Sequence, residues 1–171
     1  MSLPVNNGPP RSLIIPPNGT MGFCLAIIRI FLGVRIFVPG LAKWSWITGR
    51  ESKFEPLVHH LINNHLALTW FTPFLKNLVS YNINLFTWMM VVGELVLGVM
   101  LMAGFCTRLA AFLAMIMLFC YTCGSWYLGS AYQGMNEALF VMAFVCMITG
   151  AGRVFGFDFD MAHRNNRSIL W

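Results

Sequence analysis

Charged residues are scarce in this chain: only 10% of its 171 residues are Asp, Glu, Lys or Arg, whereas 58% are hydrophobic. Soluble domains carry about 25% charged residues, so the shortage favours lipid as the surroundings of most of the chain. The net charge is +5, but the basic residues form no run or stripe that could follow a phosphate backbone. We therefore expect contact with membrane lipid and no nucleic-acid partner.

The chain also lacks a recognisable secretion signal and a disulfide framework. Residues 1–20 contain five prolines and one charge, with no apolar stretch of signal-peptide length, and we interpret them as an extended tail. The five cysteines are odd in number and fall within or beside apolar runs, unlike an extracellular disulfide set. Cys120 and Cys123 form a C-x-x-C on an apolar segment, where packing residues are favoured over a redox pair.

Four apolar runs are about long enough to cross a bilayer. Short connections at 104–108 and 129–134 make neighbouring spans antiparallel. The sequence thus predicts an all-α membrane protein: an antiparallel four-helix transmembrane bundle with an amphipathic interfacial segment between the first and second spans. That segment is too polar to span and has apolar residues at helical spacing, so we expect a lid on the membrane surface. The expected divisions are a tail at 1–20, a domain at 21–158 with spans 21–42, 83–103, 109–128 and 135–151 and lid 43–82, and a tail at 159–171.

Basic residues near the span ends give the expected orientation. The terminal side carries more of them than the lid side, where acidic residues also offset some of the charge. We expect a multi-pass protein of a bacterial or archaeal cytoplasmic membrane with both termini in the cytoplasm. The terminal-side residues are Arg11, Arg108, Arg153, Arg164 and Arg167, and the lid-side ones are Lys43, Arg50, Lys53 and Lys76.

Four charges lie inside the expected spans: Arg29, Arg35, Glu94 and Glu137. Each costs roughly 2.5 kcal/mol or more at the bilayer centre, so we expect them to be buried and paired across helices. With the cytoplasmic span ends set level, the rise per residue predicts the pairs Arg29–Glu94 and Arg35–Glu137. Two interpretations stay open: ion pairs that fix helix register, or a polar pocket for a quinone headgroup or a proton path.

Two further groups of residues bear on packing and on ligands. Gly33 and Gly40 on the first span, and Gly93 and Gly98 beside Glu94, are expected to let helices approach closely. His59, His60 and His65 lack the i, i+4 spacing of a zinc pair, and we expect interfacial histidines and no metal. A contact of these histidines with an outer partner or a quinone remains open.

Three separated motifs resemble the DoxX/DoxD family of four-helix membrane proteins. Arg29, Gly33, Gly40 and Lys43 match its R-x3-G…G-x2-K opening. Residues 93–108 resemble its G-E-x3-G…G-x2-T-R core, and residues 150–158 are similar to its closing G-x-G-R-x3-(L/F)-D. The stretch 70–76 resembles the DoxD branch of the family. DoxD-like proteins are the membrane subunit of thiosulfate:quinone oxidoreductases.

The resemblance implies a quinone-linked redox protein that passes electrons from thiosulfate to quinone, with a second subunit as partner. It singles out five positions, of which Arg108 and Arg153 are also explained as anchors at a membrane boundary. The alternative is a non-catalytic accessory subunit of a larger respiratory, photosynthetic or oxidase complex, since no redox relay is evident in the sequence. The five positions are Arg29, Lys43, Glu94, Arg108 and Arg153. With the histidines, Lys43, Arg108 and Arg153 are the expected substrate or interface candidates.

Overall fold

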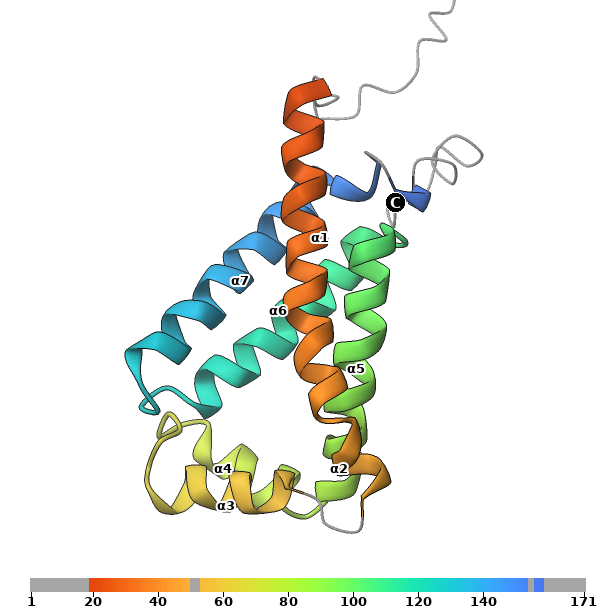
Figure 1. The fold of residues 1–171 in the computed structure, drawn as a ribbon. Helices are drawn as coiled ribbons and strands as arrows, with labels where there is room; N and C mark the ends of the chain where they lie inside the picture. The colour runs from red at the N-terminus through yellow and green to blue at the C-terminus, as the bar shows by residue number, and fades with distance from the viewer. Residues whose placement is uncertain (1–18, 50–52, 154–155, 159–171) are drawn as a thin grey trace, which may run out of the picture.

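The computed structural model describes residues 19–49, 53–153 and 156–158, and these are helical throughout with short connections. Four helices are long and apolar enough to cross a membrane, which confirms the expected fold class. They run alternately up and down, as Figure 1 shows. The spanning helices are α1 (Gly19–Ala42), α5 (Ile83–Ala103), α6 (Thr107–Gly124) and α7 (Ser130–Thr149).

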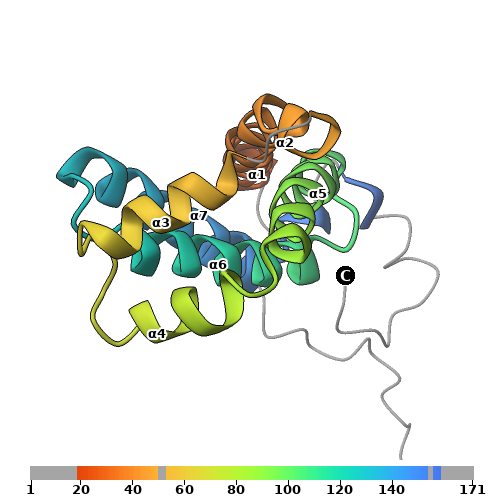
Figure 2. The same cartoon turned by 90° about the horizontal axis from the view of Figure 1, so that it is seen from below.

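The lid is a layer of short helices rather than one amphipathic helix. It follows α2 (Trp44–Thr48), which continues α1 after a break at Lys43. Seen from below, α3 lies over α6 and α7, whereas α4 lies on the side of α6 away from α7 (Figure 2). The layer is tied to the end of α6 by two backbone bonds, from Leu68 N–H to Cys123 O and from Tyr127 N–H to Leu66 O. The lid consists of α3 (Phe54–Asn63), α4 (Thr72–Phe74) and the π-helix η1 (Leu75–Val79).

Two separate apolar cores stabilise these layers. The membrane core joins all four spanning helices through residues such as Leu32, Leu101, Ala114 and Ala143. The lid core joins α3 and η1 to α6 and includes Val58 and Cys123. Cys120 packs against the same lid core, so both C-x-x-C residues contact apolar neighbours. We call the end of the bundle that the lid covers the lid end. We call the opposite end, where α1 begins and α7 finishes, the terminal end.

Helices α1 and α5 approach so closely that glycine is required on both. A Cβ at Gly98 would lie 2.9 Å from Phe37 Cα and 3.0 Å from Gly33 O. A Cβ at Gly40 would lie 2.9 Å from Glu94 Cβ. Real Cβ atoms do not come this near to backbone, so these contacts fix the register of the two helices. The close packing expected of Gly33, Gly40 and Gly98 is confirmed, whereas Gly93 has open space beside it.

Gly98→Ala should therefore destabilise the protein, and Gly93→Ala should not. The new methyl at position 98 meets backbone that cannot move aside, and such overpacking typically costs about 1–3 kcal/mol. At position 93 the methyl meets nothing within 4 Å, and alanine favours a helix over glycine by roughly 0.5–1 kcal/mol. Thermal unfolding in a mild detergent compares the two variants. An equal melting temperature for both would contradict the close approach.

Candidate functional site

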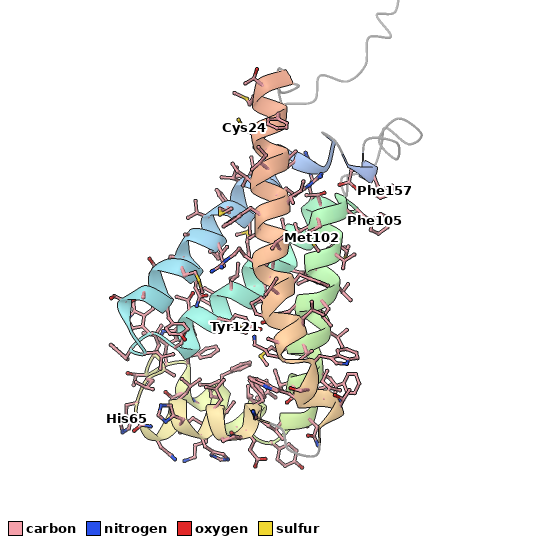
Figure 3. All side chains as sticks on the ribbon, viewed as in Figure 1. Cys24, His65, Met102, Phe105, Tyr121 and Phe157 are labelled. Atoms are coloured by element: carbon pink, nitrogen blue, oxygen red, sulfur yellow. The ribbon has the colours of Figure 1, made fainter. Side chains whose placement is uncertain are left out.

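A buried carboxylate lies where α1, α5 and α6 meet near the lid end. Glu94 of α5 is only 2% exposed, and its Oε1 accepts two hydrogen bonds. One comes from Lys43 Nζ at 2.5 Å, at the end of α1, and the other from Tyr121 Oη at 2.7 Å, on α6. We call Lys43, Glu94 and Tyr121 the polar triad. Figure 3 shows Tyr121 in the lid-side half of the bundle, between α6 and α1.

The charge of Glu94 is compensated within the polar triad. A lone carboxylate in such a place would be strongly destabilised, and the Lys43 ammonium supplies the opposite charge. Lys43 Nζ also lies 5.3 Å from the centre of the Tyr121 ring, a cation–π contact. The Lys43 side chain is 22% exposed, so the triad reaches the protein surface on that side.

One oxygen of this carboxylate remains available. Glu94 Oε2 is buried and accepts no hydrogen bond from any residue that the structure describes. Leaving a buried charged acceptor without a donor costs at least about 1–3 kcal/mol. Oε2 is thus a buried acceptor without a donor among the described residues, while Oε1 has two donors.

The expected pair Arg29–Glu94 is wrong, because Glu94 pairs with Lys43. The expected pair assumed that the cytoplasmic ends of the first two spans lie at the same height. That assumption gave the wrong register of α1 against α5. Gly40, not a residue near Arg29, lies against Glu94, and eleven residues of helix separate Gly40 from Arg29, about 16 Å. Arg29 instead lies at the terminal end, beside the turn between α5 and α6.

Arg29 is completely buried in a second polar cluster, which we call the clasp. Its Nη1 donates to Ala151 O at 3.1 Å. Asp158, also buried, accepts the backbone N–H of Cys106, the N-cap of α6, at 2.6 Å and of Thr107, its first residue, at 2.8 Å. The Asp158 N–H in turn donates to Gly104 O at 2.9 Å. The clasp thereby joins α1, the α5–α6 turn and the segment after α7.

Glycine is required in the clasp because the guanidinium packs directly on the backbone. A Cβ at Gly104, whose φ is +70°, or at Gly156 would overlap Arg29 Nη1. Figure 3 shows Phe105 and Phe157 close together at this end. Burial, and then the Asp158 carboxylate, raise the pKa of the Cys106 thiol, which lies in the turn. The Cys106 thiol is therefore a weaker acid than an ordinary cysteine.

Arg35 and Glu137 are exposed on the outside of the bundle, so the expectation that they are buried is wrong. Arg35 Nη2 lies 2.7 Å from Met135 Sδ, and the expected pair Arg35–Glu137 does not form. Asn136 is the polar residue that α7 turns inward, which rotates Glu137 outward.

The remaining candidates are dispersed. His59, His60 and His65 are exposed on the lid: His59 lies 3.9 Å from Glu55, and His60 bonds Asn64. In the described ranges no three His, Cys, Asp or Glu residues converge as metal ligands would. Arg108 lies against Gly150 at the terminal end. The Arg153 side chain, the tails 1–18 and 159–171 and the lid residues 50–52 lie outside the described residues.

Sequence reasoning missed two residues of these sites as functional groups. Tyr121 is absent from the expected site residues; its signal was a phenol within an otherwise apolar span. Asp158 was seen only as the last letter of a motif. The motif's two glycines and its arginine, with Gly156 between them and Asp158, indicated a tight polar contact at that point.

The fold and the polar triad define a class: a multi-pass helical membrane protein with a charged site inside the bundle. The DoxX family model matches residues 24–125, more than half of the chain, and the chain belongs to this family. No curated protein and no solved structure matches it. The matched residues include Arg29 of the clasp and the whole of the polar triad.

Asp158→Ala should lower the stability of the protein. The change leaves two backbone donors at the start of α6 without their acceptor, each worth about 1–3 kcal/mol, and removes a counter-charge near Arg29. Asp158→Asn keeps one acceptor oxygen and should cost less. Thermal unfolding of the two variants in detergent measures the difference. An unchanged melting temperature for Asp158→Ala would refute the clasp.

Proposed function

We propose that this chain is the membrane subunit of a quinone-linked redox system and that the polar triad binds the quinone headgroup. The observation that carries the proposal is the buried Glu94 Oε2, which accepts no hydrogen bond from the described residues. A quinol hydroxyl is a donor that fits this acceptor, and the surrounding apolar helices suit the rest of a lipid-soluble molecule.

The three side chains of the polar triad supply what quinone reduction needs from the protein. Reduction of a quinone to a quinol consumes two electrons and two protons. The Lys43 ammonium has N–H groups besides the one that Glu94 Oε1 accepts and can donate to a quinone oxygen, while Glu94 Oε2 accepts from the hydroxyl of the product. The Tyr121 hydroxyl donates to Oε1 and holds the carboxylate in place. Because Lys43 is partly exposed, protons can reach the site from the lid side without crossing the membrane core.

The electrons come from outside this chain in the proposal. By resemblance to the DoxD branch, two thiosulfate ions join to form tetrathionate and release the two electrons that one quinone takes up. A partner subunit on the lid side would carry out that step. Lys53 and Lys76 are exposed on the lid, where positive charge attracts an anionic substrate. The lid then faces the outside of a bacterial or archaeal cytoplasmic membrane, and both termini face the cytoplasm.

Glu94→Gln should weaken quinol binding by about tenfold to a hundredfold, the usual worth of a hydrogen bond to a charged group. Decylubiquinol titrated anaerobically into the chain in nanodiscs, with tryptophan fluorescence as the readout, measures the affinity. Thiosulfate-dependent quinone reduction by membranes that contain the chain and its partner should fall in parallel. Tyr121→Phe removes a single hydroxyl and should weaken binding less than Glu94→Gln does.

The control is Glu55→Gln, which removes an exposed lid carboxylate and should change neither binding nor reduction. The competing function is an accessory subunit in which the triad only fixes helix register. Glu94→Gln would then lower the melting temperature and leave the decylubiquinol affinity unchanged. That result would overturn the proposal.

A further inference from the structure

The lid segment formed by α4 and η1 carries a second apolar row besides the one that it buries. Phe71, Leu75 and Val79 belong to the lid core and are at most 6% exposed. An exposed apolar side chain stands directly before each of them in the sequence, and a fourth follows within one turn. We call these four side chains, which are between 36% and 86% exposed, the outer row: Trp70, Phe74, Leu78 and Tyr81.

The other lid helix, α3, has no such row. It buries Val58 and Leu61 against the bundle, and its exposed face is mostly polar. A helix with one apolar and one polar face is typical of a boundary between protein and water. The two parts of the lid therefore present different surfaces. The exposed residues of α3 are Glu55, Pro56, Leu57, His59, His60 and Asn63.

The outer row is continuous with the outer surface of the spanning helices. The ring centre of Trp70 lies 6.3 Å from that of Phe119 on α6, and the ring centre of Phe74 lies 6.1 Å from that of Phe86 on α5. Phe119 is itself 49% exposed on a helix that is apolar enough to cross a membrane. Figure 2 shows α4 beside α6 rather than beneath the bundle. Lipid that surrounds α6 at Phe119 is thus in reach of the outer row.

Polar side chains of this segment find hydrogen-bond partners within it. Thr72 Oγ1 donates to Leu68 O at 3.1 Å, and Ser80 Oγ donates to Leu75 O at 3.0 Å. Thr122 on the spanning helix α6 also donates to a carbonyl of its own preceding turn. Polar groups in lipid must be satisfied inside the protein because no water is there to bond them. The hydroxyls of Thr72 and Ser80 meet that requirement.

We propose that the outer row is inserted into the membrane at the lid end, so that the boundary between lipid and water runs through the lid. Trp70 and Tyr81, the two ends of the row, are of the residue types that are enriched at this level of a bilayer. Lys76 is two residues from both Phe74 and Leu78 and so lies on the opposite side of the helix. A lysine there can extend its ammonium to the lipid headgroups.

The proposal commits to lipid as the occupant of this surface. A second copy of the chain or a partner subunit would have to displace lipid that already adjoins Phe119. The inserted part of the lid is α4 with η1, and α3 stays on the water side. The insertion does not depend on a quinone at the polar triad.

Spin labels measure this difference in depth directly. p-Acetylphenylalanine is introduced at position 78 of the full chain, coupled to a nitroxide and studied in phosphatidylcholine nanodiscs; the five native cysteines stay unchanged. Collisions of the nitroxide with oxygen, which concentrates in lipid, are compared with collisions with a water-soluble nickel complex. The apolar face of an interfacial helix lies about 5–10 Å into the boundary of headgroups and acyl chains. The ratio of oxygen to nickel collisions should therefore be several-fold higher at position 78 than at position 60 of α3, the matched control.

Two further labels complete the test. A label at position 81 should also favour oxygen over nickel relative to position 60, and a label at position 113, exposed on α6, gives the value for a spanning helix. Equal ratios at positions 78 and 60 would place the outer row in water and overturn the proposal. A label at position 78 that is shielded from both reagents would overturn it as well, because protein and not lipid would then cover the row.

Discussion

The close approach of α1 and α5 is the constraint on which the rest of the structure depends. Gly33, Gly40 and Gly98 bring the two backbones so near that neither helix can slide along the other. This register carries Lys43 to the level of Glu94 and places Arg29 beside the α5–α6 turn. Both polar clusters, the clasp at the terminal end and the polar triad at the middle of α5, follow from the same line of small residues.

The charged side chains of the two clusters have different kinds of hydrogen-bond partner. In the clasp, hydrogen bonds of Arg29 and Asp158 go to backbone groups that would otherwise be buried without partners, so its charges complete the helix ends. In the polar triad, Lys43 and Tyr121 share a single oxygen of Glu94. Burying an ion pair in this way adds little stability when the cost of desolvation is counted. The second oxygen, which has no donor among the described residues, is the basis of the proposed headgroup site.

Much of the fold could be predicted from the sequence, because length and hydropathy alone define a membrane span. The spans at 21–42 and 83–103 match α1 and α5 to within two residues at each end. Pairing could not be predicted in the same way. Hydropathy does not reveal how far α1 extends beyond its neighbours, and an offset of three turns exchanged Arg29 for Lys43 as the partner of Glu94. The sequence also did not show which polar side chains of a span face the inside of the bundle. Asn136 and Glu137 are adjacent, and helix packing determines that Asn136 faces inward.

A photoreactive quinone tests the central claim, that the headgroup binds at the polar triad, most directly. Native membranes are illuminated with an azido-quinone, with and without excess unlabelled quinone, and the labelled peptides are identified by mass spectrometry. The account predicts competable labelling of the peptides that carry Lys43, Glu94 and Tyr121. Competable labelling confined to the clasp, around Arg29 and Asp158, would contradict it, as would the absence of any competable labelling.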